Sequence, residues 1–386
     1  RICVRYECVP MRFIKHVYKI HTYAQDGRLF EGKTPVSAFL NSSYDGSFIA
    51  GLMELRYIQS LPVERIINYF ESHGFTLKKP TAHKLMEKAS SLFENLYKCI
   101  RQTALSDPYK AADETYYKIL VPEKNSKGKG VRKGYLWVVV GINTRMIYLL
   151  YDDGSRSEKV ILNELGGCKG IIQSDGYSPY RKLESDAYPH ITRIPCLQHI
   201  KRKFIDCGED DPDAKRIVEM INTLYQNEHK HKIGVDGWTV EQNLVHRKKY
   251  APDILGEIKD VLDDIEERGD LLPKSELKEA ITYLRNEWNA VVDIFNYGDT
   301  YLDNNIVERM NRYISLSRKN SLFFGSHKGA ERGAILYTIA LTCRMNKVNL
   351  FEYLTDVINR TAEWQPNTPL EKYRQLLPDR WEKAND

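Results

Sequence analysis

Five runs of strand-forming residues, in a fixed order, most strongly constrain the fold of this 386-residue chain. Three runs are separated only by turns or a loop, a helix over 158–165 comes next, and two further runs follow. β-branched and aromatic residues dominate the runs, which is typical of strands. The runs span 111–121, 135–143, 145–153, 170–177 and 190–195. We therefore predict a mixed α/β protein whose first three strands form an antiparallel meander.

Two aspartates lie on the first and fourth of these strands. Alternation places Asp113 on the same face as Thr115, and Asp175 lies where the fourth strand ends at Gly176. The order of elements is that of an RNase H-like fold, in which the first and fourth strands are parallel neighbours. Asp113 and Asp175 are then expected to approach within bridging distance. An aspartate before glycine is more often an ordinary turn residue, so Asp175 alone would indicate little.

A third carboxylate lies on a helix predicted from residue 302 to residue 315. Apolar residues recur there at steps of three and four, namely Leu302, Ile306, Met310, Tyr313 and Ile314. Because successive residues rotate by about 100°, the opposite side of the helix is expected to carry Asn304, Asn305, Glu308 and Arg312. On its own, this pattern favours the solvated face of an amphipathic helix over a functional site.

Two aspartates and one glutamate from separate elements would form an all-oxygen metal site. Mg²⁺ binds such ligands, and Mn²⁺ is expected to substitute for it. Two such ions about 4 Å apart activate a water or a 3′-hydroxyl and stabilise the leaving oxygen in phosphodiester transfer. Four neighbouring side chains are expected to orient the glutamate or to hold phosphates: Asn304, Asn305, Arg309 and Arg312.

Lysine and arginine gather in short clusters, although the net charge of +5 at pH 7 is mild. Such clusters hold backbone phosphates in nucleic-acid-binding proteins, but most clusters in proteins are simply solvated. The clusters lie at 124–134, 201–203, 247–249 and 318–319. The candidate DNA contacts among them are Lys129, Arg132, Lys133, Lys201, Arg202, Lys203, Arg318 and Lys319.

Cys196 and His199 have the spacing of half a zinc site, but no second pair lies at a usual distance from them. A buried packing cysteine and a histidine at the start of a helix form the simpler interpretation. The alternative is that His199 contacts DNA or supports the carboxylate site. The seven cysteines include no C-x-x-C pair, which favours a reducing, cytoplasmic setting over a disulfide framework.

Helical patterns precede and interrupt the strand region. In the first helical stretch Pro62 opens a helix that stops at Gly74, and Thr81 is expected to cap the next helix, over 82–100. This is the layout of a helix-turn-helix, although paired helices are common without a DNA role. No apolar run approaches the roughly 20 residues that a membrane span needs. The predicted regions are a short β and linker region (1–45), a helical region (46–105), the first part of the core (106–212), an all-α insertion (213–298), the last part of the core with the Glu308 helix (299–346), and a C-terminal helix and tail (347–386).

Seven motifs between about residue 75 and the end occur in an order that resembles the DDE transposases of the insertion-sequence 66 family. Asp-Asn-Asn-x-x-Glu-Arg, followed by Arg-Lys-Asn-x-x-Phe-x-Gly-Ser, is the most specific part. The motifs are ADET (112–115), GYLWV (134–138), the run from DGSRS to LGGCKGIIQSDGYSPY (153–180), CLQHIKRKF (196–204), LDNNIVER (302–309), RKNSLFFGSHKGAERGAILY (318–337) and FEYLTDVINR (351–360).

The resemblance implies that Asp113, Asp175 and Glu308 form the metal-binding, catalytic DDE triad of an RNase H-like core. It implies cleavage and joining of the ends of an insertion sequence by direct transesterification, and it supports DNA binding by residues 46–100. Joining two ends needs two active sites, so we expect a homodimer on double-stranded DNA, with helper proteins of the same element as further partners and a cytoplasmic, nucleoid-associated location. Family members usually carry a cysteine-rich zinc-binding segment near the N-terminus, whereas the region around 21–28 has no cysteine pair.

Two other functions fit parts of the pattern. An RNase H-like, structure-selective nuclease would cut branched DNA without joining strands. A transposase-derived DNA-binding or regulatory protein would use residues 46–100 and carry out no catalysis.

Overall fold

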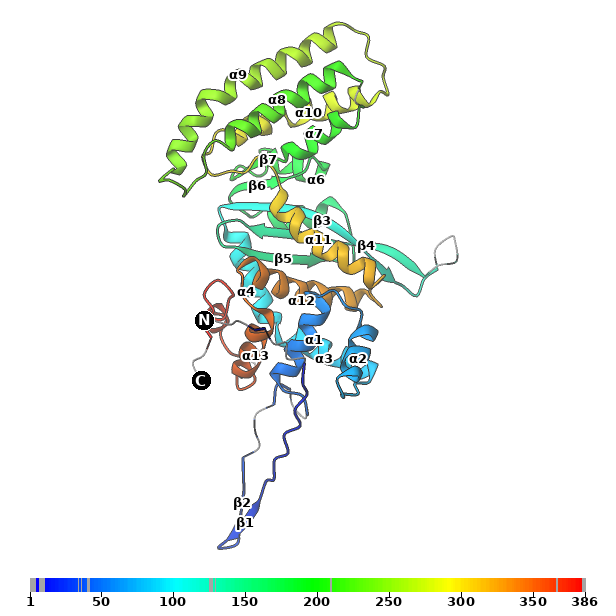
Figure 1. Cartoon of the computed structure of the whole chain (residues 1–386), viewed down its shortest axis with the longest axis vertical. Helices are drawn as coiled ribbons and strands as arrows, with labels where there is room; N and C mark the ends of the chain where they lie inside the picture. Colours follow the sequence, from blue (N-terminus) through cyan, green and yellow to red (C-terminus); the bar gives the residue numbers. More distant parts are fainter. Residues whose placement is uncertain are drawn as a thin grey trace. The chain divides into compact units, whose positions relative to one another are not determined.

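The computed structural model describes residues 5–6, 11–33, 35, 37–39, 42–124, 128, 130–208, 210–365 and 367–383. The chain divides into two compact units. The first comprises residues 1–100, 118–131 and 313–386, and the second comprises residues 101–117 and 132–312. Figure 1 shows the elements along the chain.

A five-stranded sheet confirms the predicted mixed α/β class. Its strands have the spatial order β5-β4-β3-β6-β7. β4 and β5 pair antiparallel, whereas β3 and β6, and then β6 and β7, pair in parallel. The predicted parallel pairing of the first and fourth core strands is therefore confirmed. The strands are β3 (Tyr109–Leu120), β4 (Val131–Gly141), β5 (Met146–Tyr151), β6 (Gly170–Ser174) and β7 (Ile191–Pro195).

Short helices connect the strands, and the helix predicted over 158–165 is confirmed. α5 (Glu158–Leu165) joins β5 to β6, and α7 (Leu197–Ile205) follows β7 with Cys196 as its N-cap. Between β6 and β7 lie α6 (Ser178–Arg181) and the 3₁₀ helix η1 (Lys182–Glu184). The side chains from Leu136 to Val140 on β4 are all fully buried. Since neighbouring side chains on a strand point to opposite faces, both faces of the sheet are covered there.

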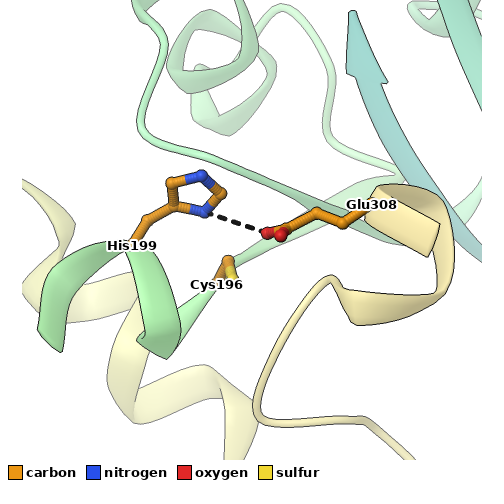
Figure 2. Close-up of side chains that lie close together, drawn as sticks. All are labelled: Cys196, His199 and Glu308. Carbon is orange, nitrogen blue, oxygen red and sulfur yellow. Dashed lines mark ion pairs between the residues drawn. The ribbon is translucent and has the colours of Figure 1, made fainter. Parts of the chain in front are cut away.

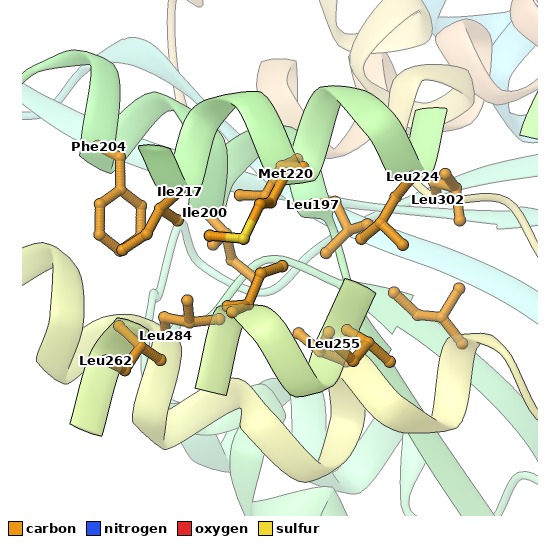
Figure 3. Packing of buried hydrophobic residues seen from close by; sticks show 14 of the residues in the cluster. Leu197, Ile200, Phe204, Ile217, Met220, Leu224, Leu255, Leu262, Leu284 and Leu302 are labelled. Atoms are coloured by element: carbon orange, nitrogen blue, oxygen red, sulfur yellow. The ribbon is translucent and has the colours of Figure 1, made fainter. Parts of the chain in front are cut away.

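Three long helices form the insertion that follows α7. They are α8 (Pro212–Glu228), α9 (Val240–Glu267) and α10 (Glu276–Ile294). Ser275 caps α10, because its side chain accepts the backbone N–H of Lys278. One face of α7 packs in the hydrophobic core of this insertion through Leu197, Ile200 and Phe204 (Figure 3). α7 thus joins the helical insertion to the sheet.

Helices also form most of the first unit, together with a short hairpin. α1 packs against α13, α12 and α3, and α12 is buried along much of its length. None of the described helices has both the length and the hydropathy needed to cross a membrane. The elements are β1 (Thr22–Gln25), β2 (Arg28–Glu31), α1 (Gly46–Tyr57), α2 (Val63–Ser72), α3 (Lys79–Leu92), α12 (His327–Met345), α13 (Leu350–Thr361) and α14 (Leu370–Arg374), and α4 (Glu94–Ser106) begins here.

The predicted cap at Thr81 and the single helix over 82–100 are wrong. α3 begins at Lys79, with Pro80 in its first turn and Lys78 as N-cap, so Thr81 lies inside the helix. Proline fixes φ near its helical value and lacks the N–H that the first turn leaves unpaired, which favours this earlier start. α3 ends at Leu92, and α4 begins after the buried residue Phe93.

Candidate active site

Asp113 and Asp175 lie on neighbouring parallel strands of the second unit. In the register of β3 and β6, Ala111 lies opposite Gln173. If the same offset continued for two more residues, Asp113 would lie opposite Asp175, which directly follows β6. The carboxylates are close enough for the charge of Asp175 to raise the pKa of Asp113. The parallel pairing of β3 and β6 thus brings the two predicted aspartates close together.

Asp113 is a buried carboxyl in an acidic setting. Burial raises the pKa of Asp113 to about 8, and the charges of Glu114 and Asp175 act in the same direction. Two donors oppose the shift: Asn311 Nδ2 donates to Oδ2 over 2.6 Å, and the Glu114 N–H donates to Oδ1 over 2.8 Å. A nearby cation would stabilise the ionised form of this carboxyl.

The loop that carries Asp175 is held from two sides. The Tyr177 N–H donates to Asp175 Oδ1 over 3.1 Å, while Arg193 Nη1 donates to the Asp175 carbonyl over 3.3 Å. The Gly176 N–H donates to the hydroxyl of Tyr283 on α10 over 2.8 Å. A Cβ at Gly176 would lie about 2.5 Å from that hydroxyl, so a larger residue would displace the tyrosine. The helical insertion therefore helps to position Asp175.

Glu114 is a further buried carboxylate, and it is not among the predicted site residues. Its pKa is raised by burial, and Asp175 contributes to the shift. The Arg156 guanidinium pairs with Glu114 and lies 4.2 Å from the ring centre of Tyr177. The signal in the sequence that could have identified Glu114 as a site residue is its place next to Asp113 in a run of strand-forming residues. Strand alternation alone assigned Glu114 to the other face of β3.

Glu308 lies on α11 (Asn305–Asn320), the helix predicted from 302. Asn304 Nδ2 donates to the Ala112 carbonyl over 3.0 Å, and Asn311 reaches Asp113. Positions 304, 308 and 311 share one side of a helix. The side of α11 that carries Glu308 therefore faces β3 beside Asp113.

The predicted orientation of this helix is wrong in one respect. Asn304 is only 2% exposed, and the buried residues that follow it on α11 include Val307, Asn311 and Ile314. The amide side chains of Asn304 and Asn311 are hydrogen-bonded to β3 and occupy part of the buried face of α11. The apolar pattern alone therefore predicts the wrong buried face for this helix. Of the two roles expected for Asn304, orientation of the Glu308 region is the one that its bond to Ala112 fits, and its phosphate contact stays a prediction.

Cys196 and His199 lie against Glu308 (Figure 2). His199 Nδ1 is 3.7 Å from Glu308 Oε1, and the buried Cys196 Sγ accepts the Asn304 N–H over 3.2 Å. Burial raises the pKa of Cys196 to about 12. Cys196 is a buried cysteine, as the simpler interpretation predicts. His199 has the position that a site-supporting residue requires.

Four buried polar atoms around this site have no hydrogen-bond partner within the described part of the chain. They are His199 Nδ1, Asn304 Oδ1, Glu308 Oε1 and Asn311 Oδ1. Buried polar atoms nearly always have a partner, and an unpaired one costs about 1–3 kcal/mol. All four can accept a hydrogen bond or bind a cation, so their chemistry fits a ligand such as a metal ion or water.

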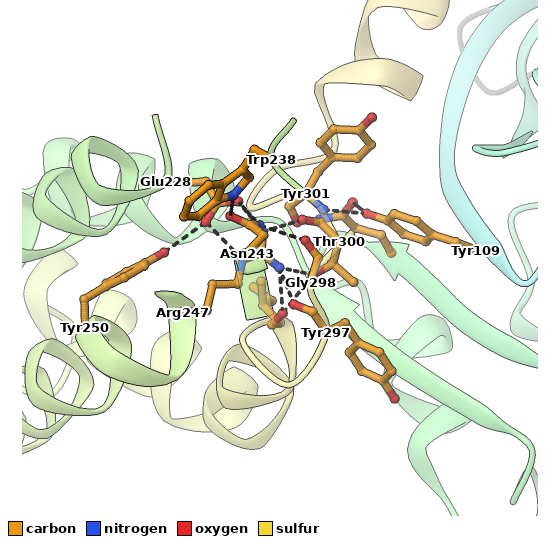
Figure 4. Close-up of polar contacts among 12 residues, drawn as sticks. Tyr109, Glu228, Trp238, Asn243, Arg247, Tyr250, Tyr297, Gly298, Thr300 and Tyr301 are labelled. Atoms are coloured by element: carbon orange, nitrogen blue, oxygen red, sulfur yellow. Dashed lines mark hydrogen bonds and ion pairs between the residues drawn. The ribbon is translucent and has the colours of Figure 1, made fainter. Parts of the chain in front are cut away.

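A hydrogen-bond network fixes the segment that leads into α11 (Figure 4). Tyr109 on β3 donates to Gln173 on β6 over 2.6 Å and accepts the Tyr301 N–H over 3.0 Å. Gln173 Nε2 donates to the Tyr301 carbonyl over 2.8 Å. The buried Arg247 on α9 donates to the carbonyls of Tyr297 and Thr300, each over 2.6 Å. The sheet and the insertion thus jointly set the start of the Glu308 helix.

The predicted DNA contacts differ in exposure. Lys129 lies outside the described residues. Lys201 and Arg318 are half-buried, and Arg318 and Lys319 belong to the first unit. The exposed candidates are Arg132, Lys133, Arg202, Lys203, Asn305, Arg309, Arg312 and Lys319. The DNA contacts of all these residues stay predictions.

The fold and the site define an α/β protein in which Asp113, Asp175 and Glu308 lie around the paired strands β3 and β6. A family model described as "Transposase IS66 family" matches residues 41–332. The chain therefore belongs to the IS66 family of transposases.

Three uncharacterized proteins of Sinorhizobium fredii (strain NBRC 101917 / NGR234) are similar to this chain. The protein y4jD is 26% identical over 346 residues, which cover 86% of this chain and 65% of the relative. The protein y4hP is 24% identical over 404 residues, covering 98% and 70%. The protein y4qI is 26% identical over 384 residues, covering 95% and 69%. The chain thus spans about two thirds of the length of these relatives.

Proposed function

We propose that this chain carries the catalytic core of a DDE transposase, which cleaves the ends of an insertion sequence and transfers the strands to target DNA. Family membership supports transposition as the general function. One observation carries the catalytic assignment: Asp113 on β3 and Asp175 after β6 are neighbours, and the side of α11 that carries Glu308 faces Asp113. The strand order β5-β4-β3-β6-β7 supports an RNase H-like core.

Asp113, Asp175 and Glu308 would hold the metal, with Mg²⁺ as the first choice and Mn²⁺ as a substitute. The donors are all oxygens, which suits these ions. The raised pKa of Asp113 supports the fit, because crowded buried carboxylates ionise more easily beside a cation. When bound, the metal supplies activation of the attacking oxygen and stabilisation of the leaving oxygen.

The other residues of the site position these carboxylates. Asn311 fixes Asp113 Oδ2 on the side of α11 that carries Glu308. The Tyr283 hydroxyl and Arg193 hold the loop of Asp175. Arg156 partly balances the acidic charge through its ion pair with Glu114. Together these contacts would keep the reacting groups in place before DNA arrives.

Double-stranded DNA is the proposed substrate, bound as element ends and as target by a homodimer. The exposed basic residues of β4, α7 and α11 would contact backbone phosphates. α2 and α3, separated by residues 73–78, are the proposed helix-turn-helix-like pair in the first unit. Helper proteins of the same element are further proposed partners.

The first test is strand cleavage of DNA that carries the element's own terminal repeats, with Mg²⁺ or Mn²⁺. We expect nicking at the repeat boundary by the wild-type chain and its loss in Asp113→Asn. Asp186→Asn, which changes an exposed aspartate, is the matched control and should nick normally. If the wild-type chain binds the repeats but no form nicks them, the chain acts as a DNA-binding protein instead. Cutting of branched DNA without joining would favour the structure-selective nuclease.

A further inference from the structure

Cys196, His199 and Glu308 bring three different donor atoms together. The sulfur, one ring nitrogen of His199 and one carboxylate oxygen of Glu308 all lie within 4.8 Å of one another. Cys196 and His199 come from the start of α7, and Glu308 comes from α11 (Figure 2). His199 Nδ1 and Glu308 Oε1 are both buried atoms without a hydrogen-bond partner among the described residues. Two atoms that lack a hydrogen bond therefore face each other, 3.7 Å apart, beside a sulfur.

This donor set differs in chemistry from the neighbouring aspartates. Mg²⁺ prefers oxygen ligands, whereas sulfur and imidazole nitrogen favour Zn²⁺ and chemically similar ions. Three protein ligands with a fourth position open is a common arrangement for zinc. Ligands in such a site lie a little over 3 Å apart, since zinc–ligand bonds measure about 2.0–2.3 Å. The separation of 3.7 Å between Nδ1 and Oε1 is close to that value.

The surrounding contacts hold the ligands in place. The Asn304 N–H donates to Cys196 Sγ, and the Leu197 N–H donates to the Leu302 carbonyl over 2.9 Å. These bonds tie the start of α7 to the segment that enters α11. An N–H directed at sulfur is also the kind of outer contact that stabilises a metal-bound thiolate. The two ligand-bearing elements are thus fixed relative to each other without any metal.

We propose that Cys196, His199 and Glu308 bind one transition-metal ion of the Zn²⁺ class, and that this ion regulates the active site by engaging Glu308. Binding releases the thiol proton of Cys196 to solvent, because a coordinated thiol is deprotonated. The regulatory half rests on the proposed function, since Glu308 is the expected third ligand beside Asp113 and Asp175. A carboxylate held by Zn²⁺ is withdrawn from that role, so Zn²⁺ slows nicking.

Cobalt titration of the full chain, without DNA, tests the metal site. Co²⁺ adopts zinc-like coordination, and its bond to a thiolate gives a charge-transfer absorption band. We expect this band at one equivalent in the wild-type chain, with loss in Cys196→Ser, weakening in His199→Gln and displacement by Zn²⁺. Cys207→Ser removes a half-buried thiol just beyond α7, and Asp113→Asn alters the proposed Mg²⁺ site. Both controls should keep the band.

The outcomes separate this proposal from the transposase assignment. Absence of the band in a wild-type chain with a folded far-ultraviolet spectrum, or its survival in Cys196→Ser, overturns the metal site even if the chain nicks DNA. A band without nicking leaves the metal site standing and removes the transposase assignment. For regulation, nicking with and without one equivalent of Zn²⁺ is compared within each variant. Equal inhibition of wild type and His199→Gln overturns control through this site.

Discussion

Asp113 lies in acidic surroundings, with Glu114 and Asp175 close to its carboxyl. Its raised pKa has Glu114 and Asp175 among its causes, and Asn311 works against the shift. A cation at this site would therefore lower the free energy of the ionised Asp113 carboxylate. Because Asn311 favours the ionised form, it lowers the cost of preparing Asp113 for a cation.

Asp113→Asn should remove a pH dependence of stability. The pKa of Asp113 rises from 3.8 in the unfolded chain to about 8 in the folded one, so the folded state binds more protons between these values. The free energy of unfolding then falls as pH rises through this window, by up to about 1.4 kcal/mol for each pH unit. Urea unfolding without metal, at pH 5 to 8, measures this change in the free energy of unfolding.

The variant should gain stability over the wild type as pH rises from 5 to 8, because it has no carboxyl to ionise. Mg²⁺ at pH 8 should narrow that gap by stabilising the wild type more than the variant. Asp186→Asn, at an exposed position, should follow the wild-type curve. Parallel curves for Asp113→Asn and wild type would contradict the raised pKa.

At the scale of elements, the insertion acts as a support for the site. Tyr283 on α10 holds the backbone after Asp175, and Arg247 on α9 holds the backbone before Glu308. Tyr283 and Arg247 lie on different helices, yet each holds the backbone of a segment that carries a proposed catalytic residue. The insertion thus contributes to active-site geometry without supplying a proposed metal ligand.

Arg247→Met should destabilise the second unit strongly. Arg247 is fully buried and pairs with Glu228 while donating to the carbonyls of Tyr297 and Thr300. Methionine keeps much of the volume but takes the cation from the half-buried Glu228 carboxylate and the guanidinium donors from two carbonyls, and breaking such a pair costs about 3–5 kcal/mol. Lys249→Met, two residues away and exposed, is the control. A loss below about 1 kcal/mol in urea unfolding would show that the network carries little energy.

The sequence predicts the elements better than their contacts, for identifiable reasons. Strands and their order follow from β-branched runs, and the parallel pairing of β3 with β6 follows from that order. The face of α11 does not, because Asn304 and Asn311 are buried through hydrogen bonds that no hydropathy pattern encodes. The support from Arg247 is likewise hidden, since a Lys-Arg cluster normally indicates a solvated surface.

At the scale of the whole molecule, the distribution of charge matters more than its sum. The net charge is +5 at pH 7, which is too small to hold DNA firmly by itself. The exposed residues Arg202 and Lys203 on α7 lie shortly after His199 in the sequence, and His199 belongs to the site. If these cations touch phosphates, their removal changes DNA affinity more than the removal of equal charge elsewhere.

The double variant Arg202→Gln and Lys203→Gln tests this local effect. Each phosphate contact contributes roughly 0.9 to the slope of log affinity against log salt concentration. Loss of two contacts should therefore lower that slope by roughly 1.8 and weaken binding most at low salt. Fluorescence anisotropy with labelled duplex at several salt concentrations measures the slope.

The control carries the same charge change at exposed positions of the insertion, Lys259→Gln with Lys274→Gln. Both double variants lower the net charge from +5 to +3, so a long-range field would affect them equally. A reduced slope in the α7 variant alone indicates direct phosphate contacts by Arg202 and Lys203. Equal reductions would mean that DNA senses only the overall charge, and the contacts predicted for α7 would then have to be abandoned.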